Sequence, residues 1–79
     1  MAWLPTITVE GAANPVVQVV HEATGEIVYT LRIQGTSYRP KVFAKGKYTI
    51  HVGEGKNRKT LKGISSLDKS TKKTITVEF

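Results

Sequence analysis

Apolar and polar side chains alternate along most of this chain, and that period of two constrains its fold more than any other feature. The pattern is clearest in residues 15–33, where two runs rich in β-branched residues flank the loop 23–25, Ala-Thr-Gly. Such alternation is typical of a strand with one buried face, and glycine suits the left-handed position of a short hairpin loop. If Glu22 pairs with Glu26, the register of the whole hairpin follows. Its predicted inner face carries Val17, Val19, His21, Ile27, Tyr29, Leu31 and Ile33.

The same alternation recurs in shorter runs along the rest of the chain. The side chains expected to point inward are Trp3, Ile7 and Val9 near the start, Tyr48, Ile50 and Val52 in the middle, and Ile75, Val77 and Phe79 at the end. Residues typical of turns separate these runs. The sequence predicts about seven short strands, formed by residues 3–10, the two arms of the hairpin, and residues 40–44, 47–52, 59–64 and 74–79.

Composition favours strands over helices. Val, Ile and Thr make up 25 of the 79 residues, against five Ala and four Leu. β-Branched side chains pack well on pleated sheets, whereas Ala and Leu favour helices. Without helices to cover them, two half-polar sheets bury their apolar faces against each other. We therefore expect an all-β fold, an antiparallel β-sandwich of the immunoglobulin-like or prealbumin-like kind. Residues 1–79 would form a single such domain of a larger multidomain protein.

Two motifs resemble segments of transthyretin-like and carboxypeptidase-regulatory-like domains. Residues 43–52, FAKGKYTIHV, are similar to the "P-x-G-x-Y-x-V-x-V" strand of these domains. Residues 22–29, EATGEIVY, are similar to the preceding "D-x-x-T-G-x-x-V" hairpin. The chain departs from the pattern at Lys45, where proline is common, and at residues 34–36, where "T-D-x-x-G" usually follows. The resemblance implies an immunoglobulin-like or prealbumin-like sandwich, a kind of module that is mostly non-catalytic and part of secreted or surface proteins.

The longer motif also has a physical interpretation of its own. Gly46 supplies a turn conformation that a side chain would oppose. Tyr48 begins an inward stripe, and its hydroxyl is placed to reach the backbone near the corner, as in the tyrosine corner of such sandwiches. A plain role as a core aromatic residue is the alternative. Together with Gly25 in the hairpin loop, Gly46 and Tyr48 are the predicted structural residues.

Side chains that could carry chemistry are few and dispersed. The chain has no cysteine, which excludes a disulfide framework, a thiol nucleophile and a cysteine-based zinc site. His21 lies at the end of the apolar hairpin face and His51 on the outer face of its strand, without a third ligand at metal-binding spacing. The sequence contains no recognisable pair of catalytic acids and no nucleophile with an activating base. We expect no enzyme activity, no cofactor and no metal site.

Positive charge is concentrated in the second half of the chain. Residues 39–79 hold eleven basic and three acidic side chains, a net charge of +8, whereas residues 1–38 hold one basic and three acidic ones, a net charge of −2. Candidate contacts to a polyanion are Arg39, Lys41, Lys56, Arg58, Lys59, Lys62, Lys72 and Lys73. Nine of the twelve basic residues are lysine, however, which is more typical of edges kept soluble than of phosphate or base recognition.

These features favour a non-catalytic accessory or docking module of a larger, exported protein, located outside the cytoplasm. Its partner would be a neighbouring domain of the parent chain or a surface ligand rather than nucleic acid, and we expect a monomer. No stretch approaches the roughly 18 apolar residues that a spanning helix needs. The alternative is a small basic β-barrel that binds a polyanion, either single-stranded nucleic acid or an acidic polysaccharide.

Overall fold

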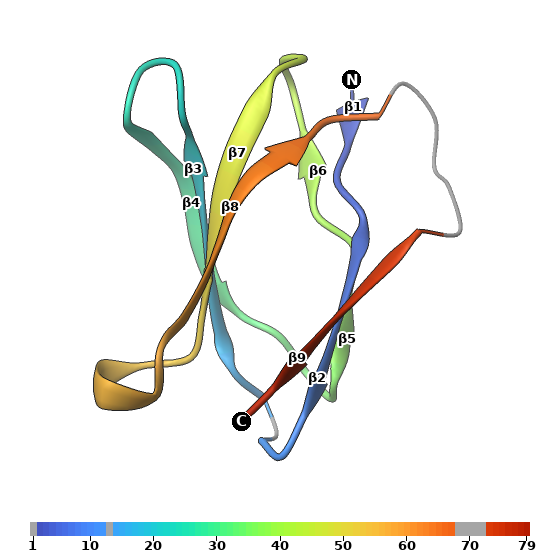
Figure 1. Ribbon diagram of the computed structural model, residues 1–79, viewed down its shortest axis with the longest axis vertical. Helices are drawn as coiled ribbons and strands as arrows, with labels where there is room; N and C mark the ends of the chain where they lie inside the picture. Colours follow the sequence, from blue (N-terminus) through green and yellow to red (C-terminus); the bar gives the residue numbers. More distant parts are fainter. Residues whose placement is uncertain (1, 13, 68–72) are drawn as a thin grey trace.

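The computed structural model describes residues 2–12, 14–67 and 73–79, which form an all-β, sandwich-like fold (Figure 1). The elements in chain order are β1 (Ala2–Trp3), β2 (Thr6–Glu10), β3 (Val16–His21), β4 (Glu26–Arg32), β5 (Ser37–Tyr38), β6 (Lys41–Val42), β7 (Lys47–Val52), the 3-10 helix η1 (Gly55–Asn57), β8 (Lys59–Ser65) and β9 (Thr74–Glu78). The predicted all-β class is confirmed. In the described part of the chain, no helix has the length and apolar character needed to cross a bilayer.

The strands form two main sheets and a short ribbon. Strands β4, β3, β7 and β8 make a four-stranded antiparallel sheet in that order, while β5, β2 and β9 make a three-stranded sheet and β1 pairs with β6. Figure 1 shows the four-stranded sheet on one side and the other two groups facing it. The described residues contain more strands than the seven expected, because the run 3–10 splits at Pro5, which cannot donate a ladder hydrogen bond, and because the two-residue β5 was not predicted.

An apolar core fills the space between the layers. Its buried residues, each at most 5% exposed, are Ala2, Leu4, Ile7, Val9, Val17, Val19, Ile33, Val42, Tyr48, Ile50, Val52 and Val77. The predicted inward phase of β7 is confirmed, since Tyr48, Ile50 and Val52 all belong to this core. Burial of each large side chain stabilises the fold by roughly 1.5–3 kcal/mol.

The central hairpin follows the predicted register over only part of its length. The pairs that involve Val16 to Val19 are as predicted, but a β-bulge then shifts the pairing by one residue. The loop has four residues instead of three; Gly25 has a φ of 71° and donates its N–H to the carbonyl of His21 at 2.8 Å. Because the bulge reverses the facing of the residues beyond it, the prediction that Ile27 points inward is wrong, and its side chain is 55% exposed.

Strands β2 and β9 have the same sequence, Thr-Ile-Thr-Val-Glu, and pair in parallel. Each residue lies opposite its counterpart, from Thr6 and Thr74 to Glu10 and Glu78. The expectation of a purely antiparallel sandwich is therefore wrong for this pair. Val77 points into the core as predicted, but Phe79 lies beyond the last residue of β9 and is 36% exposed, so its predicted inward position is wrong.

Candidate functional site

The outer face of the β1–β6 ribbon brings one aromatic ring together with two cations. Trp3 lies opposite Lys41 in the ribbon. The guanidinium carbon of Arg39 lies 4.7 Å from the centroid of the Trp3 ring, and Nζ of Lys41 lies 5.1 Å from it. Both distances fall within the range of about 6 Å at which a cation is attracted to an aromatic face. We call this set of three residues the ribbon cluster.

The ribbon cluster exists because Trp3 does not point inward. Ala2 and Leu4 are the buried residues of this segment, so Trp3 is only partly buried and the inward prediction for it is wrong. Pro5 separates β1 from β2, and the alternation restarts with Ile7 in the core. Two of the eight predicted polyanion contacts, Arg39 and Lys41, are thereby joined to an aromatic side chain.

A second feature is an exposed aromatic residue beside an aromatic-lined hollow. Phe43 is 86% exposed and lies in the segment between β6 and β7. The hollow next to it has a volume of about 300 Å³ and is lined by His21, Glu26, Val28, Tyr29, Phe43, Ala44 and Tyr48. Gly46 has a φ of 147°, and a Cβ added there would lie 3.2 Å from Nε2 of His21, so glycine leaves room for this wall of the hollow. We call this feature the Phe43 hollow.

Tyrosine hydroxyls fix the walls of the Phe43 hollow. Tyr48 donates to the carbonyl of Ala44 at 2.6 Å, so its hydroxyl reaches the backbone four residues upstream. Tyr29 donates to the carbonyl of Lys41 at 3.3 Å, and the hydroxyl of Tyr38 lies 3.4 Å from that of Tyr29. Burial raises the pKa of both Tyr29 and Tyr48 above the usual value, which favours the protonated hydroxyls that donate these bonds. These bonds tie the hollow to the β6 strand of the ribbon.

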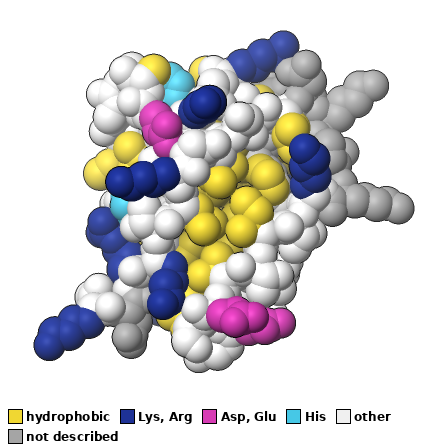
Figure 2. All heavy atoms as spheres, viewed as in Figure 1, with side chains coloured by type: hydrophobic (Ala, Val, Ile, Leu, Met, Phe, Trp, Pro, Cys, Tyr) yellow, Lys and Arg dark blue, Asp and Glu magenta, His cyan; other side chains and the backbone are white. Residues whose placement is uncertain are grey.

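The other predicted polyanion contacts among the described residues do not join the ribbon cluster. Lys56, Arg58, Lys59 and Lys62 lie along η1 and β8, Lys73 precedes β9, and Lys72 lies outside the described residues. On the face drawn in Figure 2, basic side chains stand singly around a central apolar area. The positive charge of the described residues is spread over several elements of the fold. In the ribbon cluster, two of these cations lie against an aromatic ring.

Polar contacts hold the outer face of the four-stranded sheet. One carboxylate oxygen of Glu22 accepts hydrogen bonds from the N–H of Gly63 at 2.7 Å and from the hydroxyl of Thr49 at 2.8 Å. These bonds lower the pKa of Glu22. Nδ1 of His51 lies 2.9 Å from the hydroxyl of Thr60, and desolvation together with nearby positive charge lowers the pKa of His51. No group of three potential metal ligands occurs in the parts of the chain that the structure describes.

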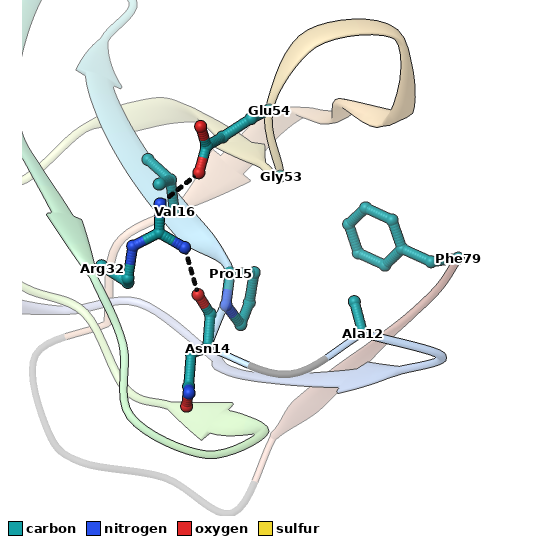
Figure 3. Close-up of a pocket in the computed structure, with 8 residues that line it drawn as sticks. All are labelled: Ala12, Asn14, Pro15, Val16, Arg32, Gly53, Glu54 and Phe79. Atoms are coloured by element: carbon teal, nitrogen blue, oxygen red, sulfur yellow. Dashed lines mark hydrogen bonds and ion pairs between the residues drawn. The ribbon is translucent and has the colours of Figure 1, made fainter.

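A third feature is an arginine that joins two loops at the end of the sandwich (Figure 3). Arg32 donates to the carbonyl of Asn14 at 2.8 Å and forms an ion pair with Glu54. Asn14 has a φ of 51°, and its side-chain oxygen accepts a hydrogen bond from the N–H of Gly35 at 2.6 Å. The adjoining hollow, about 230 Å³, has Phe79 on its far side. Because both charged groups are exposed, the ion pair stabilises the fold by no more than about 1 kcal/mol.

The chain matches no protein-family model, no curated protein and no solved structure. The function of this chain therefore has to be inferred from the geometry and chemistry of the three features described above.

Proposed function

We propose that this chain is a non-catalytic docking module of a larger, exported protein, and that the Phe43 hollow is its docking site. The observation that carries the proposal is the 86% exposure of Phe43 at the rim of a hollow with His21, Tyr29 and Tyr48 in its walls. Buried aromatic anchors supply much of the binding energy at protein interfaces. Phe43 would be such an anchor, and the hollow beside it would receive an apolar side chain of the partner.

The walls of the hollow are already held in place. The His21 ring lies 5.0 Å from the ring of Tyr48, and its Nδ1 lies 3.3 Å from the hydroxyl of Thr24. The hydroxyls of Tyr29 and Tyr48 are bound to backbone carbonyls. A preformed surface loses little conformational entropy when a partner binds, which favours a docking role.

Photo-crosslinking in the parent protein tests this function. With benzoylphenylalanine in place of Phe43, we expect ultraviolet light to form an adduct with a neighbouring domain or with a separate surface protein, identified by mass spectrometry. The matched control places the same residue at Ile27, which is also exposed but does not line the hollow. Equal adduct yields at the two positions, or none at position 43, would refute docking through the hollow.

The second candidate function is binding of a polyanion, and the ribbon cluster is the observation that favours it. Arg39 and Lys41 both lie against the Trp3 ring, 4.7 and 5.1 Å from its centroid, so two positive charges stand beside one aromatic side chain. Anionic groups of a nucleic acid or an acidic polysaccharide would bind these two cations with release of counterions.

Trp3 is the only tryptophan of the chain and reports directly on this second function. We expect its fluorescence to change when heparin or a single-stranded DNA oligonucleotide is added, with an affinity that falls steeply as salt rises. The double variant Arg39→Gln, Lys41→Gln should abolish the change, whereas the matched control Lys56→Gln, Lys59→Gln should weaken binding only slightly. No change at low salt, or equal losses in both variants, would exclude the ribbon cluster as the site.

A further inference from the structure

Within the part of the chain that the structure describes, strand β9 is an edge strand without the usual protection against pairing. It ends the order β5-β2-β9, and no other strand in the described residues pairs with it. Natural edge strands are kept apart by lysines, by bulges or by being short. Here β8 carries Lys59 and Lys62 and a pairing irregularity, β4 contains a bulge, and β5 has two residues. By contrast, β9 runs for five regular residues, and its only charged side chain is Glu78.

Two backbone hydrogen bonds to β2 show which groups of β9 face the open edge. The N–H of Thr6 donates to the carbonyl of Lys73 at 3.0 Å, and the N–H of Phe79 donates to the carbonyl of Glu10 at 2.8 Å. Peptide groups of successive residues point to opposite sides of a strand, so the odd-numbered residues from 73 to 79 face β2. The N–H and C=O groups of Thr76 therefore point away from β2.

The open edge of β9 has the same sequence and the same backbone direction as the edge of β2 to which β9 is bound. In β2, the even-numbered residues face β9, while the N–H of Val9 donates to Thr36 on the other side. At the open edge of β9, Thr76 occupies the place that Thr8 has on the edge of β2 facing β9. A further strand of this sequence would meet the same backbone spacing and the same neighbouring side chains that β9 meets on β2.

An apolar area adjoins the open edge. Figure 2 shows hydrophobic side chains gathered in the middle of the face that is drawn. In the same view in Figure 1, this area lies between the edges of β8 and β9. The inward side chains of these edges include Leu61 and Ile64 on β8 and Ile75 on β9, which pack on the core but are only partly buried. A strand added parallel to β9 would point its own apolar side chains toward this area.

We propose that the β9 edge binds an extended peptide segment of a partner protein, in parallel, with residues that alternate between hydroxyl and β-branched apolar side chains. The β2–β9 pair is the example of such a complex that the structure itself provides. A second folded copy of the chain cannot supply such a parallel strand, because the backbone groups of its own Thr-Ile-Thr-Val-Glu strands that would have to face β9 already face β2 or β5. This inference rests on the proposed docking function but uses a surface separate from the Phe43 hollow.

The test uses a fluorescein-labelled peptide with the sequence of residues 73–79, Lys-Thr-Ile-Thr-Val-Glu-Phe. We expect saturable binding by anisotropy at micromolar to millimolar protein concentration. Thr76→Pro removes an N–H from the open edge without removing a bond to β2, and we expect it to weaken binding roughly tenfold or more. The matched control, Thr76→Ala, keeps that N–H and should bind normally.

Two peptide variants keep the test decisive even if Thr76→Pro does not fold. N-methylation of the peptide's valine blocks an N–H that would face β9, and N-methylation of its second threonine blocks one that would face solvent. We expect the first to lose binding and the second to keep it. Equal effects, or no binding of the parent peptide, would overturn the proposal while leaving the Phe43 crosslinking result unaffected. Self-association without peptide that Thr76→Pro abolishes would also overturn it, in favour of a second copy.

Discussion

Replacement of Tyr48 by alanine is expected to lower the free energy of unfolding by about 3–5 kcal/mol, the usual cost of truncating a large buried aromatic side chain. The Tyr48 side chain is 2% exposed and lies 5.0 Å, ring to ring, from His21. Alanine would leave a cavity beneath the Phe43 hollow and remove the hydroxyl that binds the carbonyl of Ala44. Urea denaturation followed by circular dichroism measures the change.

Two further variants separate the contributions at this position. Tyr48→Phe keeps the ring and removes only the hydrogen bond, so we expect a loss of about 0.5–1.5 kcal/mol. Thr49→Ala, on the opposite face of the same strand, should change stability by about 1 kcal/mol or less, because the hydroxyl that it removes bonds the exposed carboxylate of Glu22. If Tyr48→Ala unfolded at the same urea concentration as Thr49→Ala, the inward phase of β7 would be wrong.

The sequence predicts the fold correctly in those strands where inward and outward side chains alternate without interruption. Alternation correctly predicted Tyr48, Ile50 and Val52 in the core. The register predicted for the hairpin correctly predicted Val17 and Val19 there. In these strands each inward residue has an apolar neighbour across the layer, so local pattern and tertiary packing agree. Turn residues at Gly25 and Gly46 marked their ends, and both have positive φ angles.

The predictions failed where the period of two is interrupted by a feature that alternation alone does not show. A bulge in β4 moved Ile27 to solvent, and Pro5 let Trp3 turn outward. One signal was available and was missed. The identical sequences of β2 and β9 could have suggested that the first and last long strands lie side by side, although not that they pair in parallel.

The candidate sites were harder to predict than the core because they depend on contacts between distant segments. The charge distribution singled out Arg39 and Lys41, but nothing in the sequence indicated that Trp3 would pair opposite Lys41 and lie beside Arg39. Phe43 lies within the predicted strand 40–44, but β6 ends at Val42 and a bend follows, so the Phe43 side chain is exposed. Short strands of two residues carry too little pattern to be recognised.

The other large expected effect concerns Gly11, in the turn that follows β2. Gly11 has a φ of +86°, and a Cβ added there would lie 2.7 Å from the backbone oxygen of Phe79. The N–H of Phe79 donates to the carbonyl of Glu10 at 2.8 Å, which holds this end of the chain against the turn. We expect Gly11→Ala to lower the free energy of unfolding by about 2–5 kcal/mol, from the strained φ and the overlap together.

Gly35→Ala is the matched control, because it measures the cost of the left-handed backbone conformation without any steric overlap. Gly35 has nearly the same φ, +89°, but nothing lies within 4 Å of the added Cβ. We expect this variant to lose only about 1–2 kcal/mol, the cost of a left-handed conformation in a residue other than glycine. The difference between the two variants in urea denaturation therefore measures how tightly Phe79 is held against the turn. Equal losses would show that the end of β9 yields freely, and a strand edge so loosely held at its end would also be a poor template for an added peptide.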